Sequence, residues 1–149
     1  MFPIWIVPPL GAVIAITGFV TANVIGARLG HVATFLPLVS DGGAFPPELC
    51  IFTLSLSILS VLFAFFSYIR HLHVVEFYER EMRRTDVWWK SLSYRLFLVG
   101  VLRALGMLAI AAISVRSHFI IHMVFTVGTF IMCIVYGWGQ LYLMYTLTP

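Results

Sequence analysis

The chain has very few charged residues. Of its 149 residues, 10% are Asp, Glu, Lys or Arg, whereas 61% are hydrophobic. Soluble domains carry charges on about a quarter of their residues, so this composition excludes an ordinary water-soluble fold. The length limits the chain to a single domain. We therefore expect an integral membrane protein.

Sequence signatures of common catalytic and metal sites are also missing. The chain has no glycine-rich phosphate loop, no Cys-x-x-Cys pair, no His-Glu-x-x-His and no Gly-x-Ser-x-Gly. Asp41 and Glu48 lie seven residues apart and could form an acid–base pair, but no nucleophile lies near them in the sequence. We expect no enzyme activity, no cofactor and no metal site.

The cysteine content and the net charge exclude few further classes of protein. The two cysteines, Cys50 and Cys133, fall within apolar runs, which favours buried thiols over a disulfide. The net charge of +3 arises largely from one short segment. We interpret it as a signal for orientation in the bilayer rather than for nucleic-acid binding.

Four apolar runs are long enough to cross a membrane. A helix rises about 1.5 Å per residue, so about 20 apolar residues span the hydrocarbon layer of about 30 Å. The predicted fold is an all-α bundle of four transmembrane helices. Pro8 and Pro9 should delay the regular part of the first helix until about Pro9, and we expect this span to stay uncleaved. The predicted spans are residues 4–27, 49–69, 96–115 and 119–142.

Small and hydroxyl residues recur at helical spacing and predict helix contacts. In the second span Ser55 points away from the hydroxyl face, which we interpret as an interhelical seam with a polar pathway as the alternative. In the third span Gly100 and Ala104 lie on a face suited to close packing. The stripe of the first span comprises Gly11, Ala15, Gly18, Ala22 and Gly26, and the hydroxyl face comprises Thr53, Ser57, Ser60 and Ser67.

The segment 70–95 contains six basic residues, whereas the connections after the first and third spans have one each. The positive-inside rule places this segment in the cytosol, with both chain ends, and places the loop 28–48 in a lumen or outside the cell. Trp88, Trp89 and Tyr94 read as an interfacial anchor. Residues 74–84 could form a short surface helix. Its charges suit a solvated face or a site for anionic lipid headgroups, formed by Arg80, Arg83, Arg84 and Lys90.

Three polar residues fall inside the predicted spans. Asn23 should bond to a neighbouring helix. Arg103 either extends to the cytosolic headgroups or binds a specific polar partner. His122, near the luminal end of the fourth span, is either a satisfied structural group or a sensor of luminal acid, since imidazole takes up a proton between about pH 5 and 8.

The loop before the second span has its own local signals. Gly42 and Gly43 predict a tight turn after Ser40 and Asp41, because glycine adopts backbone angles closed to other residues. Pro46 and Pro47 suit an extended segment and then the first helical position. Glu48 would follow in the first turn, where the helix dipole favours a negative charge. A well-formed helix start explains these residues, and a binding site is the alternative.

A longer motif runs through residues 30–52, and its positions are Gly30, His31, Phe35, Leu36, Pro37, Ser40, Asp41, Gly43, Pro46, Pro47, Glu48, Ile51 and Phe52. In these positions the chain resembles the DRAM family, the damage-regulated autophagy modulators. Gly106-Met107, His122, Tyr136 and Gln140 continue the resemblance, although Val124 and Phe125 stand where that family has small residues. The resemblance covers residues 4–142, four of the six spans typical of the family.

The resemblance implies a non-catalytic modulator of autophagy in the lysosomal membrane, with a link to apoptosis and the plasma membrane as the alternative location. The wider superfamily implies a second function in lipid handling, such as GPI-anchor remodelling or the maintenance of plasma-membrane lipid asymmetry. A third interpretation is a truncated assembly module that binds other membrane proteins or a second copy of itself. The expected partners are the bilayer, anionic lipid headgroups and membrane proteins, with no nucleic acid.

Overall fold

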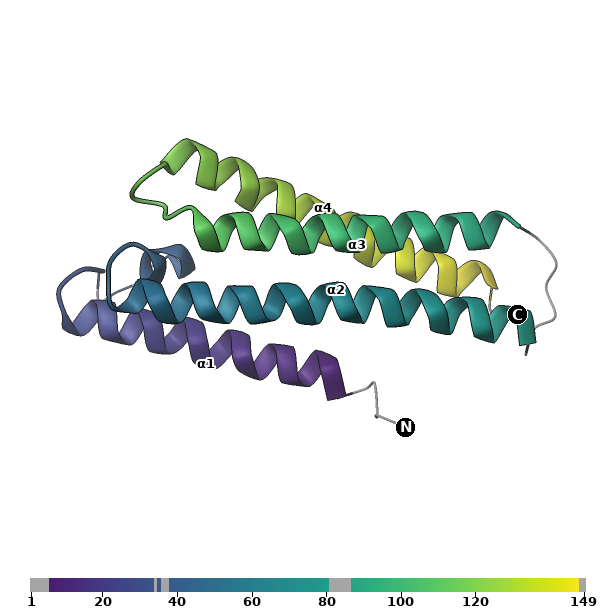
Figure 1. Ribbon diagram of the computed structural model, residues 1–149, viewed down its shortest axis with the longest axis horizontal. Coiled ribbons are helices and arrows are strands. Elements are labelled where there is room, and N and C mark those ends of the chain that lie inside the picture. Colours follow the sequence, from purple (N-terminus) through teal and green to yellow (C-terminus); the bar gives the residue numbers. More distant parts are fainter. Residues whose placement is uncertain (1–5, 34, 36–37, 81–86, 148–149) are drawn as a thin grey trace.

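The computed structural model is a row of long helices joined by short connections (Figure 1). It describes residues 6–33, 35, 38–80 and 87–147. Within these residues all regular structure is helical. All four α-helices are long and apolar enough to cross a membrane, as predicted. The elements are α1 (Val7–Arg28), the 3₁₀ helix η2 (Val39–Gly43), α2 (Glu48–Arg80), α3 (Trp88–Ala112) and α4 (Phe119–Leu147).

Several helix ends differ from the sequence prediction. The first helix begins at Val7, because prolines in a first turn lack only N–H groups that have no intrahelical partner there. Residues 74–80 of the predicted surface helix are instead part of α2, and residues 81–84 lie outside the described residues. The third helix begins at Trp88 and ends at Ala112, so much of the predicted loop 70–95 is helical. Hydropathy marks the apolar centre of a helix, and helices extend beyond it into the polar interface.

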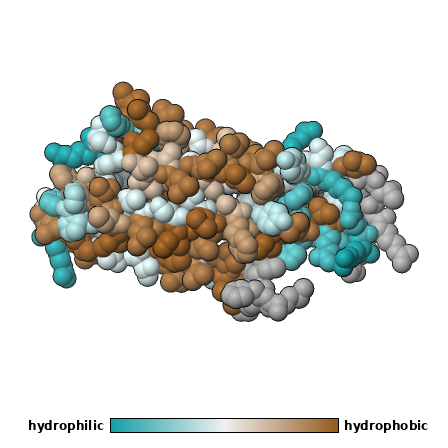
Figure 2. Space-filling view, viewed as in Figure 1, coloured by the Kyte–Doolittle hydropathy of each residue, from teal (hydrophilic) through white to brown (hydrophobic). Residues whose placement is uncertain are grey.

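Hydrophobic residues cover the middle of the face that Figure 2 shows. Figure 2 shows hydrophobic residues across the centre of this face and hydrophilic residues gathered at its two ends. About 11% of the apolar span of α1 and of α4 is buried within the chain, against 28% for α2 and α3. The central pair therefore carries most of the internal packing, and α1 and α4 present most of their surface to lipid.

Each successive pair of long helices has a glycine set against a hydroxyl residue. A Cβ atom on Gly18 would lie 2.6 Å from the Cβ atom of Ser55, and one on Gly100 would lie equally close to that of Ser67. A Cβ atom on Gly106 would collide with the hydroxyl of Thr129. Lipid supplies no hydrophobic force between helices, so such close approach is a main source of their association. The predicted small-residue stripe of α1 is confirmed, since Gly18, Ala22 and Gly26 are buried.

Hydroxyl groups of α2 also bond across to α3. Thr53 donates to the carbonyl of Ala111 at 3.2 Å, and Ser60 donates to that of Ala104 at 2.7 Å. Ser55 lies on the α1 side and bonds back to Ile51 of its own helix. The predicted interhelical seam is therefore confirmed.

A second apolar cluster ties together the end of the molecule that contains the α2–α3 connection. Val74, Tyr78, Trp89 and Leu143 form its buried core, from α2, α3 and α4. Trp89 is fully buried, so its predicted role as an interfacial anchor is wrong, whereas Trp88 and Tyr94 are exposed and their anchoring stays a prediction. The two cysteines are free thiols, as predicted, but both are exposed rather than buried.

We predict that Gly18→Ala lowers the free energy of unfolding by about 1–3 kcal/mol, because the added methyl group overpacks the α1–α2 contact. Gly128→Ala is the matched control, since a Cβ atom there meets open space. The control should be neutral or stabilising by up to about 1 kcal/mol, because alanine favours helix. Reversible unfolding of the purified chain in mixed micelles measures both. Equal effects of the two substitutions would contradict the close α1–α2 approach.

Candidate functional site

The end of α1 places His31 beside the start of α2. Gly30 has a φ of 76°, the left-handed conformation that glycine adopts without steric cost. The N–H of His31 donates to the carbonyl of Gly26 at 2.9 Å and that of Gly30 to Ala27 at 3.2 Å. These two bonds form a Schellman motif, which ends the helix and reverses the chain. From the sequence, Gly30 was assigned only to the family pattern, although a glycine after a long apolar run is itself a helix-end signal.

His31 pairs with Glu48, which is fully buried in the first turn of α2. The distance from Nδ1 of His31 to Oε1 of Glu48 is 2.7 Å, and the His31 side chain is 31% exposed. The second carboxylate oxygen of Glu48, Oε2, is buried and has no partner among the described residues. A buried carboxylate without a partner lowers the stability of the fold by several kcal/mol. Glu48 therefore does more than complement the helix dipole.

His31 and Arg116 both pack against the ring of Phe45. The ring of His31 stacks on Phe45 with centroids 4.8 Å apart, and the guanidinium of Arg116 lies 4.2 Å from the same ring. The hydroxyl of Ser114 donates to the carbonyl of Gly43 at 3.1 Å. The α3–α4 turn is thereby joined to the loop before α2. We call His31, Phe45, Glu48, Ser114 and Arg116 the loop cap.

The loop 38–44 is shaped by packing rather than by unusual backbone angles. Gly42 and Gly43 belong to η2 and neither has positive φ, so the predicted reason for the glycine pair is wrong. Both glycines are buried, and a Cβ atom on Gly43 would lie 2.6 Å from the ring of Phe52. The carboxylate of Asp41 accepts from the N–H of Leu38 at 2.9 Å and closes the turn locally.

Three other residues of the predicted motif lie in η2 or directly before α2. Ser40 lies within η2. Pro46 and Pro47, joined by a cis peptide bond, precede the helix. Pro47 was predicted at the first helical position, but α2 begins one residue later, at Glu48. Pro37 lies outside the described residues.

Asn23 bonds to the loop and to its own helix, not to a neighbouring helix as predicted. Its Nδ2 atom donates to the carbonyl of Phe19 at 2.9 Å and to that of Val39, in η2, at 3.4 Å. The position of Asn23 near the end of α1 brings it level with η2, which the sequence of a single helix could not reveal.

His122 connects the start of α4 to the residue that follows α3. Nδ1 lies 2.6 Å from the carbonyl of Ile113, just after α3, and must carry the proton because a carbonyl only accepts. The side chain is 2% exposed, and Nε2 is buried without a partner among the described residues. His122 therefore ties the first turn of α4 to the end of α3, and a role in sensing acid stays a prediction.

Arg103 lies between helices rather than extended to headgroups. Its guanidinium lies 3.8 Å from the ring centroid of Phe63 on α2 and 5.9 Å from that of Tyr136 on α4. Its Nη1 atom is 3.6 Å from Sγ of Cys133. Of the two alternatives, the structure favours specific partners, although these are aromatic rings and a thiol rather than an acid.

The predicted basic lipid site is not assembled as expected. Arg80 pairs with Glu76 at 2.9 Å, and Lys90 pairs with Glu79, so both cations are partly neutralised. Arg83 and Arg84 lie outside the described residues. The basic cluster therefore stays a prediction.

The two acids of the loop do not pair with each other. Asp41 and Glu48 make separate bonds, to a backbone N–H and to an imidazole. Within the described residues, no group of three or more His, Cys, Asp or Glu side chains could hold a metal ion. The exposed edge of His31 and the exposed Arg116 can donate hydrogen bonds to a ligand or a partner loop, whereas Glu48 is buried beneath them.

Comparison with known proteins identifies related chains. The family model described as the Frag1/DRAM/Sfk1/Cwh43P N-terminal domain matches residues 3–149. The chain is 30% identical over 131 residues to DNA damage-regulated autophagy modulator protein 2 of Mus musculus and of Homo sapiens, a match that covers 88% of this chain and 47% of each relative. It is 27% identical over 132 residues to DNA damage-regulated autophagy modulator protein 1 of Xenopus laevis, covering 89% of this chain and 54% of the relative.

The chain spans about half the length of these curated relatives. No solved structure matches the chain.

We predict that His31→Ala and Glu48→Ala each lower the free energy of unfolding by about 2–3 kcal/mol, since each leaves a buried or half-buried polar group unpaired. The double variant should lose less free energy of unfolding than the two single variants together, with a coupling energy of about 1–2 kcal/mol. His118→Ala, an exposed histidine at the same end of the molecule, is the control and should be neutral. Strict additivity of the two single effects in detergent unfolding would show that the pair does not stabilise the loop cap.

Proposed function

The chain belongs to the Frag1/DRAM/Sfk1/Cwh43P family, and from this membership we propose that it is a non-catalytic, multi-pass membrane modulator of autophagy that acts at the lysosomal membrane. The observation that carries the proposal is the family match over residues 3–149. The curated relatives that match are named as DNA damage-regulated autophagy modulators. The four membrane-crossing helices support a role within a bilayer.

The loop cap is the surface through which we propose that the chain meets a partner. It presents a partly exposed imidazole and the exposed Arg116 at one end of the molecule, and the buried carboxylate of Glu48 holds the imidazole in place from below. The same residues, His31 and Glu48, belong to the motif by which the sequence resembles the DRAM family. In the proposed orientation this end faces the lumen and the α2–α3 connection faces the cytosol with both chain ends.

The location and activity can be tested in cells with the tagged full-length chain. We expect it to colocalise with lysosomal markers and to change autophagic flux on overexpression, and we expect Glu48→Gln to weaken the effect on flux at an unchanged protein level. His118→Ala should behave as the unmodified chain. Staining confined to the plasma membrane, or flux equal to that of empty vector, would overturn the proposal.

The orientation has a separate test. After replacement of Cys50 and Cys133, single cysteines at Ser40 and at Glu79 should react with an impermeant maleimide from opposite sides of the membrane. Glu79 should be labelled from the cytosol, because the basic residues cluster beside it. Labelling of both positions from one side would reverse or remove the proposed topology.

A second candidate function, membership of a larger membrane assembly, is favoured by the open arrangement of the helices. Only about 11% of the spans of α1 and α4 is buried within the chain, so both helices have surface that another protein could cover. Cross-linking in detergent that yields a defined complex with a second copy or another membrane protein would support this function. A third candidate, lipid handling, would predict loss of GPI-anchored proteins from the cell surface when the chain is deleted.

A further inference from the structure

Two arginines that contact α4 have no carboxylate partner among the described residues. The ion pairs of that part of the chain are His31–Glu48, Glu76–Arg80 and Glu79–Lys90. Arg70 and Arg103 take part in none of them. Arg103 lies within a membrane-crossing helix, where an unneutralised charge is costly and is usually paired or faces a polar pathway, and Arg70 follows directly after the apolar run of α2. An anion that the described residues do not supply would neutralise both.

Both arginines contact α4, on either side of Tyr136. Nε of Arg70 donates to Oε1 of Gln140 at 3.2 Å, and Nη1 of Arg103 lies 3.6 Å from Sγ of Cys133. Cys133 and Gln140 are seven residues apart, about 10 Å along the helix axis. The two guanidinium groups thus bracket the turn of α4 that carries Tyr136.

Tyr136 lies between them. Its side chain is 7% exposed, and its hydroxyl is buried, with the side chains of Ser67 and Gln140 close to it but no hydrogen bond of good geometry among the described residues. Its ring lies beside the tight contact of Gly100 with Ser67, so the hydroxyl is held where α2, α3 and α4 meet. An anion between the arginines would accept a hydrogen bond from it.

We propose that Arg70, Arg103 and Tyr136 bind the phosphate of an anionic phospholipid, drawn from the leaflet on the side of the α2–α3 connection. Guanidinium groups bind phosphate with paired, charge-assisted hydrogen bonds. The approach is from the bilayer, because Cys133, which contacts Arg103, is exposed on α4.

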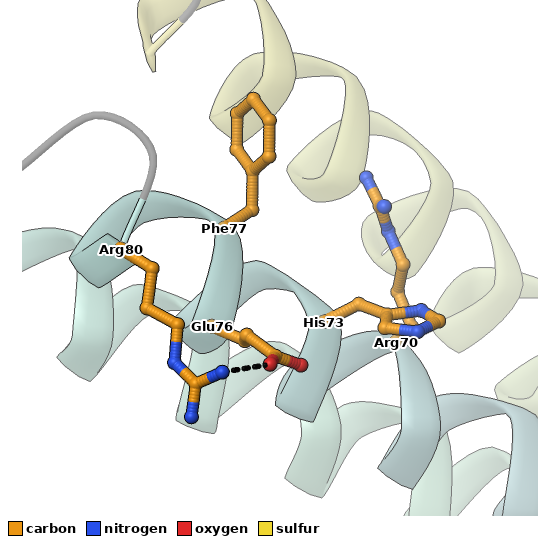
Figure 3. Close-up of a pocket in the computed structure, with 5 residues that line it drawn as sticks. All are labelled: Arg70, His73, Glu76, Phe77 and Arg80. Atoms are coloured by element: carbon orange, nitrogen blue, oxygen red, sulfur yellow. Dashed lines mark ion pairs between the residues drawn. The ribbon is translucent and has the colours of Figure 1, made fainter.

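A shallow depression lies beside the proposed site. Arg70 lines this depression of about 420 Å³ with His73, Glu76, Phe77 and Arg80. In Figure 3 the Arg70 guanidinium points toward α4, while Arg80 is occupied by its ion pair with Glu76. The three residues of the proposed site are therefore not those of the basic cluster predicted from the sequence. The site does not depend on the proposed role in autophagy.

The test uses the purified full-length chain in a neutral maltoside detergent with three probes: phosphatidic acid, phosphatidylcholine and inorganic phosphate. Native mass spectrometry should show one retained phosphatidic acid, and this lipid should raise the midpoint of thermal unfolding in a saturable manner. Arg70→Gln and Arg103→Gln should each weaken its binding by about tenfold, the loss of one charge-assisted pair. Tyr136→Phe, which preserves packing, should weaken it by about threefold.

Arg95→Gln is the matched control, because Arg95 is exposed on α3 and its loss removes the same charge. It should bind phosphatidic acid as the unmodified chain does. Equal loss in the control, or equal retention of phosphatidylcholine, would overturn the site. Displacement of the lipid by inorganic phosphate at similar concentration would overturn the lipid as the ligand. If Arg103→Gln does not fold, Arg70→Gln and Tyr136→Phe decide: unchanged binding in both would refute the proposal.

Discussion

The helical layer depends on backbone approach at three glycines. Gly18, Gly100 and Gly106 each face a serine or threonine of a neighbouring helix, and a methyl group at any of them would collide with that residue. In water a buried leucine seam would hold such helices together, but lipid solvates leucine as well as a protein does. Dispersion contacts and hydroxyl bonds, such as Ser60 to the carbonyl of Ala104, therefore take over the role that hydrophobic burial has in soluble bundles. The relative positions of α1 to α4, and with them both candidate sites, follow from these contacts.

Much of this fold could be predicted from the sequence, because membrane-crossing helices are encoded locally. Long apolar runs indicate such helices whatever their neighbours, and the glycine stripe of α1 indicates a contact face by spacing alone. The helix ends were less predictable. Hydropathy changes at Ile69, yet α2 continues to Arg80, since charged residues are compatible with a helix once it has left the hydrocarbon layer. The small-residue pattern also could not distinguish a turn glycine from a packing glycine, and Gly42 and Gly43 proved to be the second kind.

The polar sites were only partly predictable, because their partners are distant in the sequence. His31 and Glu48 both belonged to the motif that carried the family resemblance, but their pairing across 17 residues required the turn at Gly30. Arg70 was seen only as one of six basic residues, and its bond to Gln140 spans 70 residues. Arg103 was recognisable as an intramembrane charge, whereas its aromatic neighbours Phe63 and Tyr136 carried no signal of that contact in the sequence. Spacing identifies chemistry within one helix, and tertiary packing decides which helices share it.

Because α2 is longer than the hydrocarbon layer is thick, one end of the molecule lies outside the lipid. Its 33 residues rise about 50 Å, well beyond a hydrocarbon layer of about 30 Å. The cluster of Val74, Tyr78, Trp89 and Leu143 belongs to this overhang, close to water and headgroups. There the ordinary hydrophobic effect applies, with its large heat capacity and its weakening in the cold and in urea. The glycine contacts in the lipid lack that dependence, so cooling or mild denaturant should loosen the overhang while the membrane-embedded seams stay closed.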